Sequence, residues 1–98
     1  MAEAGRYRLS PLAQADLEDI WSYTALRWSP MQAESYHATI IGAFEGLAAG
    51  RKQGRSADIR AGYLKYRVGS HVVFYRLSEA GIDIMRVLHE RMDVSRHF

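Results

Sequence analysis

The sequence predicts one α+β domain with two layers, in which a pair of helices packs on an antiparallel sheet. Apolar residues recur at spacings of three and four between residues 10 and 50, which is typical of helices. From Tyr63 onwards they alternate instead, which is typical of strands. Two glycine-containing turns divide this second part into three stretches. The expected order is therefore strand, helix, helix, strand, strand, strand.

The size and composition set the class of protein. A chain of 98 residues fits a single domain covering residues 1–98. No apolar run approaches the roughly 20 residues that span a bilayer, and Met1–Gly5 has neither the basic nor the apolar region of a signal peptide. The chain has no cysteine, which excludes disulfides and cysteine-based zinc sites. We expect a cytoplasmic protein without a membrane segment.

The first half begins with a short strand over residues 7–10 and continues as a helix. Ser10 is a suitable N-cap, and Pro11 fits the first helical position. The stripe that should face the core consists of Ala13, Leu17, Ile20, Trp21, Thr24 and Trp28. Three acidic residues, Asp16, Glu18 and Asp19, lie mostly off this stripe, and no histidine joins them at ligand spacing. We therefore expect no metal site.

A second helix should follow almost without a loop, because Ser29 and Pro30 repeat the same start signal. Its expected buried positions are Ala33, Tyr36 or His37, Ile40, Phe44 and Leu47. Gly42 and Gly46 lower helix propensity by about 1 kcal/mol each, so we expect a backbone, that of the first helix, to approach closely there. Gly50 should end the helix, and residues 51–56 should form a basic surface loop.

The second half predicts a three-stranded meander over residues 63–68, 71–77 and 82–90. The stretch from His71 to Leu77 is apolar on both faces, as expected for a central strand. A helical pair can cover only one face of this sheet, so the other face should stay partly open to a partner. Residues 94–98 are expected to form a loose tail in which only Phe98 docks.

The last strand runs into the charged residues His89, Glu90, Arg91 and Asp93. This cluster is a candidate site, or the strand simply reaches solvent there. Charge is also uneven along the chain. Residues 1–50 hold three basic and six acidic side chains, a net −3, whereas residues 51–98 hold ten and five, a net +5. A basic half attracts nucleic acid or an acidic protein segment, or is a solvated face.

Four stretches in a fixed order carry a family resemblance. They are Ser10-Pro11-Leu12-Ala13-Gln14-Ala15-Asp16-Leu17-Glu18-Asp19-Ile20, a second helix ending at Leu47 before a glycine-bearing loop, Gly62-x-x-x-Tyr66-Arg67-Val68-x-x-His71-x-x-x-Tyr75, and Arg86-Val87-Leu88-His89-Glu90-Arg91-Met92-Asp93. They cover roughly residues 7 to 93. In these stretches the chain resembles the RelE/ParE superfamily of toxin–antitoxin modules, and the last one favours the ParE type.

The resemblance implies a toxin that a ParD-like antitoxin holds inactive in a hetero-oligomer. ParE-type toxins are associated with inhibition of DNA gyrase, whereas RelE-type relatives cleave messenger RNA in the ribosome. That cleavage needs an acid, a base and cations around the phosphate, and RelE-type relatives supply lysines, arginines and a late tyrosine or histidine. This chain has only two lysines and no tyrosine after Tyr75. Gyrase inhibition without a catalytic residue or cofactor is therefore the leading hypothesis.

Two alternatives remain open. As a ribonuclease, the chain would have to use His89, Arg67, Arg86 and His71. As a binding module without toxicity, it would retain only its antitoxin contacts. The candidate apolar contacts are Tyr7, Leu17, Trp21, Tyr36 and Phe44, and the candidate charged contacts are Arg67, Arg76 and Arg86. Under the leading hypothesis, His89, Glu90, Arg91 and Asp93 are the candidates for toxicity, and the toxin alone is not expected to bind nucleic acid.

Overall fold

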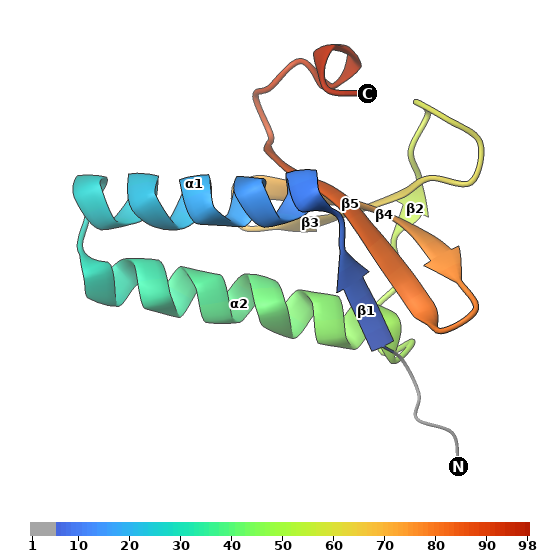
Figure 1. Ribbon diagram of the computed structural model, residues 1–98, viewed down its shortest axis with the longest axis horizontal. Helices are drawn as coiled ribbons and strands as arrows, with labels where there is room; N and C mark the ends of the chain where they lie inside the picture. The colour runs from blue at the N-terminus through green and yellow to red at the C-terminus, as the bar shows by residue number, and fades with distance from the viewer. Residues whose placement is uncertain (1–5) are drawn as a thin grey trace.

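The computed structural model describes residues 6–98. Met1–Gly5, where we expect no signal peptide, lies outside the described residues. The elements, in order, are β1 (Arg6–Leu9), α1 (Pro11–Arg27), α2 (Pro30–Ala48), β2 (Arg55–Ser56), β3 (Leu64–Val68), β4 (His71–Ser78), β5 (Gly81–His89) and a short 3₁₀ helix (Val94–Arg96) (Figure 1). No described helix combines the length and the apolar character needed to cross a membrane.

The strands form one sheet in the order β1-β5-β4-β3-β2. The last three strands form the expected antiparallel meander, and β1 lies parallel to β5 at the edge. The predicted α+β fold is therefore confirmed, with β4 inside the sheet. Strand β2 was not predicted, because two exposed polar residues carry no alternation. Arg55 and Ser56 form a strand because they pair with Lys65 and Leu64 of β3.

Both predicted helix starts are confirmed. The Ser10 hydroxyl oxygen accepts a bond of 3.0 Å from the Ala13 N–H, and that of Ser29 accepts one of 3.0 Å from the Gln32 N–H. At the end of α2, Gly50 takes the left-handed conformation (φ +80°) directly after the cap residue Ala49. These local signals make α1 and α2 an antiparallel pair on one side of the sheet (Figure 1).

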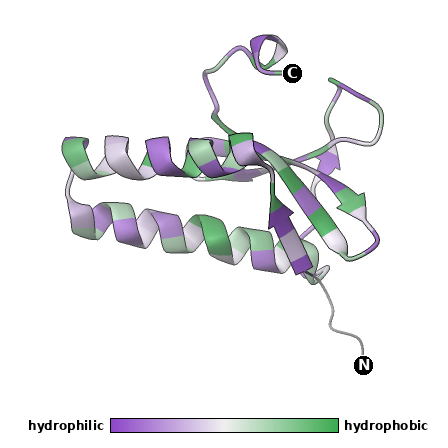
Figure 2. Ribbon diagram, in the orientation of Figure 1, coloured by the Kyte–Doolittle hydropathy of each residue, from purple (hydrophilic) through white to green (hydrophobic). Residues whose placement is uncertain are grey.

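The main core lies between this pair and the sheet. Its central side chains, Phe44, Ile40, Ile84 and Val73, are fully buried, and Figure 2 shows hydrophobic and hydrophilic residues alternating along β5. The predicted stripe of α1 extends too far, because Trp28 is 70% exposed. Trp28 is the C-cap, where the backbone has already left the helix.

The prediction that the backbone of α1 approaches closely at Gly42 and Gly46 is wrong. A Cβ atom at Gly42 would meet nothing within 4 Å, and one at Gly46 would meet the Lys52 side chain at 2.9 Å. The loop after α2, and not α1, therefore packs on Gly46.

The second face of the sheet is covered by the chain itself. Tyr63, Phe74 and Leu88 are buried there, with Val94 and Phe98 packed against them. The Phe98 ring stands edge-on to Tyr63 and Phe74, at centroid distances of 5.5 and 5.2 Å. Docking of Phe98 is thus confirmed. This face is less open than expected, because the tail and the segment before β3 pack on it, although Val72 and Met85 there are only partly buried.

Candidate functional site

Helix α1 is anchored to β5 by an ion pair. Strand β1 ends at Leu9, opposite Ile84, and the Ser10 hydroxyl donates to the Met85 carbonyl at 2.8 Å, so the edge of β5 is open beyond Met85. Asp16 fills this gap: its carboxylate accepts bonds of 2.8 Å from Nε and from Nη2 of Arg86, and one of 2.9 Å from the Val87 N–H. We call this arrangement of Asp16, Arg86 and the Val87 N–H the anchor.

The anchor gives Arg86 a structural role. Both charged side chains are only 13% exposed, and the hydrogen bonds that the guanidinium donates to Asp16 raise the pKa of Arg86. Nη1 of Arg86 also donates to the His97 carbonyl at 3.3 Å, which ties the tail to β5. Arg86 is therefore not the free surface charge that the antitoxin and ribonuclease hypotheses required. Asp16 had no predicted role beyond its place in the family-like opening.

The end of the sheet brings two histidines together. His71 of β4 and His89 of β5 are paired across the strands, with ring centroids 5.3 Å apart. Nδ1 of His71 lies 2.7 Å from the Tyr36 hydroxyl, which also accepts a bond of 3.2 Å from the Ser70 N–H. The sequence suggested both histidines separately, but their pairing depends on the register of two strands.

Hydrogen bonding indicates the tautomer of His89, and burial disfavours the charged form of His71. Nδ1 of His89 accepts a bond of 3.1 Å from the Arg91 N–H, so the proton of the neutral ring must lie on Nε2. Burial lowers the pKa of His71, and the charge of His89 lowers it further, against the raising effects of Glu90 and Asp16. At neutral pH, His71 is therefore uncharged, and His89 can offer the cleft a donor at Nε2.

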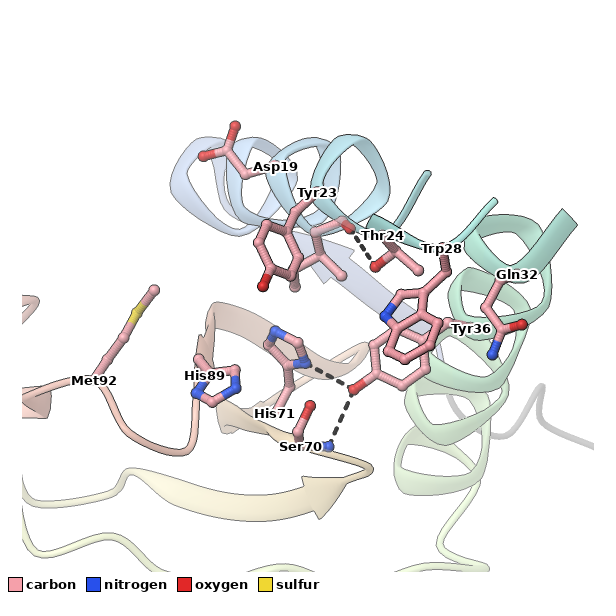
Figure 3. A pocket seen from close by; sticks show the side chains of 11 residues that line it. Asp19, Tyr23, Thr24, Trp28, Gln32, Tyr36, Ser70, His71, His89 and Met92 are labelled. Atoms are coloured by element: carbon pink, nitrogen blue, oxygen red, sulfur yellow. Dashed lines mark hydrogen bonds between the residues drawn. The ribbon is translucent and has the colours of Figure 1, made fainter. Parts of the chain in front are cut away.

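A cleft of about 550 Å³ opens beside the two histidines (Figure 3). Its lining comes from both helices and the end of the sheet. The apolar and aromatic lining residues are Ile20, Tyr23, Trp28, Tyr36 and Met92, and the polar ones are Asp19, Thr24, Gln32, Ser70, His71 and His89. Among the described residues, no lysine or arginine lines this cleft.

The four toxicity candidates have different surroundings. His89 lines the cleft. Glu90 forms an ion pair with Arg67, whose Nε also donates to the Gly69 carbonyl at 3.0 Å. Asp93 caps the 3₁₀ helix and accepts bonds from the Ser95 N–H (3.1 Å) and hydroxyl (2.7 Å). Arg91 is exposed.

The structure removes two residues from the predicted antitoxin contacts. Phe44 is fully buried and Leu17 is 6% exposed, so both pack the core and cannot reach a partner. Tyr7 is half-buried against Phe44, with ring centroids 5.3 Å apart. Trp21 is partly buried.

The remaining predicted contacts reach the surface. Tyr36 opens into the cleft. Arg67 and Arg76 keep 65% and 51% of their side chains exposed, although each has a carboxylate partner. Within residues 6–98, no group of three or more His, Asp or Glu side chains is placed to hold a metal ion.

Comparison with known proteins identifies the family. The family model described as "ParE toxin of type II toxin-antitoxin system, parDE" matches residues 7–94. The chain belongs to the ParE toxin family. It is 50% identical over 96 residues to "Toxin ParE1" of Mycobacterium tuberculosis (strain H37Rv), covering 96% of this chain and 98% of that relative. It is 42% identical over 92 residues to "Toxin ParE1" of Caulobacter vibrioides, covering 93% and 95%.

Solved structures show that the ParE fold extends to distant sequences. A chain of the "Chromosomal ParDE TA system from P. aeruginosa" has a TM-score of 0.75 at 18% identity, covering 90% of this chain and 98% of that one. A chain of the M. tuberculosis complex titled RelBE2 has a TM-score of 0.62 at 18% identity, covering 91% and 94%. At this identity, the likeness concerns the fold alone.

Proposed function

We propose that this ParE-family toxin inhibits DNA gyrase as a non-catalytic surface inhibitor and that a ParD-like antitoxin neutralises it in a hetero-oligomer. Family membership supports the toxin role. The observation that favours gyrase inhibition over RNA cleavage is that the candidate arginines are already paired with carboxylates. Arg86 is bound by Asp16, Arg67 is paired with Glu90, and no described cation lines the cleft. A pentavalent phosphate would therefore find little positive charge beside the histidines.

The charge and exposure of the chain support the antitoxin. The second half carries the net +5, and Arg67 and Arg76 are exposed within it. An acidic, amphipathic segment fits this surface, with Tyr7, Trp21 and Tyr36 as the remaining apolar contacts. Chains of similar fold come from structures titled as a ParDE system and a RelBE2 complex. We take such a toxin–antitoxin complex as the model for this chain. Because gyrase acts on chromosomal DNA, the proposal places the toxin in the cytoplasm.

A supercoiling assay tests the main proposal. Purified free toxin should block supercoiling by gyrase, or should trap gyrase on cleaved DNA, and the purified antitoxin should reverse the effect. The same preparation should leave ribosome-bound messenger RNA intact. Unchanged supercoiling at a large excess of folded toxin would reject gyrase inhibition and leave the ribonuclease and the antitoxin-binding module without toxicity.

One observation favours the ribonuclease as a second candidate. His71, His89 and the Tyr36 hydroxyl lie together in an open cleft, and the Nε2–H of His89 could serve as a general acid. His89→Gln decides between the two. A ribonuclease should lose about 10²–10⁴ in rate, whereas a surface inhibitor should keep most of its activity. Cuts in translated messages that vanish with this substitution would establish RNA cleavage and reject the gyrase proposal.

A further inference from the structure

The cleft beside the histidines presents aromatic rings that no part of the described chain covers. Tyr23 and Trp28, which line it, are 64% and 70% exposed. Figure 3 shows Tyr23 on one side of the cleft and Trp28 and Tyr36 on the other. The face of an aromatic ring carries partial negative charge, so such rings attract cations, and arginine most often.

The charges around the cleft also favour a cation. Asp19 lies one helical turn before Tyr23 and is the one acidic side chain in the described lining. Burial lowers the pKa of His71 and so disfavours a positive charge there, and Nδ1 of His89 is already the acceptor for the Arg91 N–H. The cleft thus differs from the surroundings of the exposed side chains Arg67 and Arg76. An acidic segment suits such arginines and would find no counter-charge in the cleft.

The size and shape of the cleft suit a long side chain. Its volume of about 550 Å³ lies in the range of roughly 300–1,000 Å³ typical of ligand sites. Arginine buries its stem along apolar surface while its head stays near water, and Ile20 and Met92 supply such surface here. The planar guanidinium can stack on an aromatic face, which a lysine ammonium cannot do.

We propose that the cleft binds an arginine side chain from a segment of a partner protein. The guanidinium lies against the rings of Tyr23 and Trp28, the stem lies along the apolar wall, and Asp19 at the edge of the cleft adds a negative charge that attracts the cation from further away. This proposal concerns the cleft alone and does not depend on whether gyrase is the target.

The experiment uses the full chain, labelled with ¹⁵N, and three small probes followed by NMR. N-acetyl-argininamide is compared with its citrulline analogue, which has the same shape without charge, and with N-acetyl-glutamate amide. The arginine probe should shift the Trp28 indole N–H and the backbone N–H of Ser70. It should bind about 3- to 10-fold more tightly than the citrulline analogue, and the glutamate probe should bind most weakly.

Three variants assign the effect to the cleft. Trp28→Leu and Asp19→Asn should each reduce the preference for arginine over citrulline. Leu26→Ala is the matched control, because Leu26 is 90% exposed on the same helix and does not line the cleft. It should leave the preference unchanged. Thermal melting checks that all three variants fold.

The proposal is overturned by any of the following results. One is equal binding of the arginine and citrulline probes, and another is a preference that survives both cleft variants. The third is a set of shifts that map elsewhere, or no shift up to the solubility limit of the arginine probe.

Discussion

Helix α1 meets the end of the sheet in two different ways along its length. In its first half, the anchor joins two charged side chains and a strand N–H, each hydrogen-bonded, and leaves the ion pair 13% exposed. In its second half, Tyr23 and the C-cap Trp28 border the cleft and stay mostly exposed. The anchor therefore fixes where the cleft forms but contributes no surface to it. Substitutions at the anchor should change stability, and those at the cleft should change binding.

The largest expected effect is at the anchor. Asp16→Ala leaves a guanidinium that is only 13% exposed, and the Val87 N–H, without their partner. We expect a loss of about 3–5 kcal/mol in the free energy of unfolding, measured by urea denaturation.

Asp83→Ala is the matched control for this prediction. Like Asp16, Asp83 forms ion pairs, but its two partners, Arg8 and Arg76, are 72% and 51% exposed. Exposed pairs of this kind contribute about 0–1 kcal/mol. Equal losses for the two alanine variants would show that the anchor is no stronger than a surface pair, and the contrast between the two regions would fail.

The contrast also explains what could be predicted from the sequence. The caps at Ser10 and Ser29 were predictable because a cap and its helix are adjacent in the chain. The anchor was not, since Asp16 and Arg86 lie 70 positions apart and meet only because β1 ends before β5 does. Strand β2 likewise has no signal of its own.

The cleft was partly predictable. His71, His89 and Tyr36 were all named as candidates from the sequence, but separately. Their meeting requires the register in which His71 pairs with His89 and a second helix that places Tyr36 against them. Trp28 was assigned to the core because its spacing continues the apolar stripe of α1. Periodicity could not show that the helix ends one residue earlier.

A smaller effect is expected at the wall of the cleft. Gly69 has a φ of +58°, and a Cβ atom there would lie 2.7 Å from the Tyr36 hydroxyl oxygen. Gly69→Ala should therefore cost about 1 kcal/mol for the left-handed backbone and about 1–3 kcal/mol for displacing Tyr36.

Gly62→Ala separates these two costs. Gly62 also has a positive φ (+85°), but a Cβ atom there meets nothing within 4 Å. It should show the backbone cost alone in the same urea experiment. If both variants lose the same stability, Tyr36 moves aside freely and does not hold the turn at Gly69.

The smallest expected effect is the pH dependence of the cleft. The pKa of His71 lies below its ordinary value of 6.5 in the folded chain, because burial and His89 disfavour its charged form more than Glu90 and Asp16 favour it. Below about pH 6.5 the unfolded chain then binds more protons at this position than the folded chain. The stability that His71 contributes is therefore complete above about pH 6.5, falls as the pH drops, and stops falling below the folded pKa.

Urea midpoints at about pH 7.5, 6.5 and 5.5 measure this effect in the wild-type chain and in His71→Gln. Gln keeps a hydrogen-bonding group near Tyr36 but does not titrate. The wild-type chain should lose more stability between the two lower pH values than the variant does. Parallel profiles would mean that His71 is not the source of the pH dependence. A steeper wild-type profile would assign this pH sensitivity to His71, and therefore to the cleft that it lines.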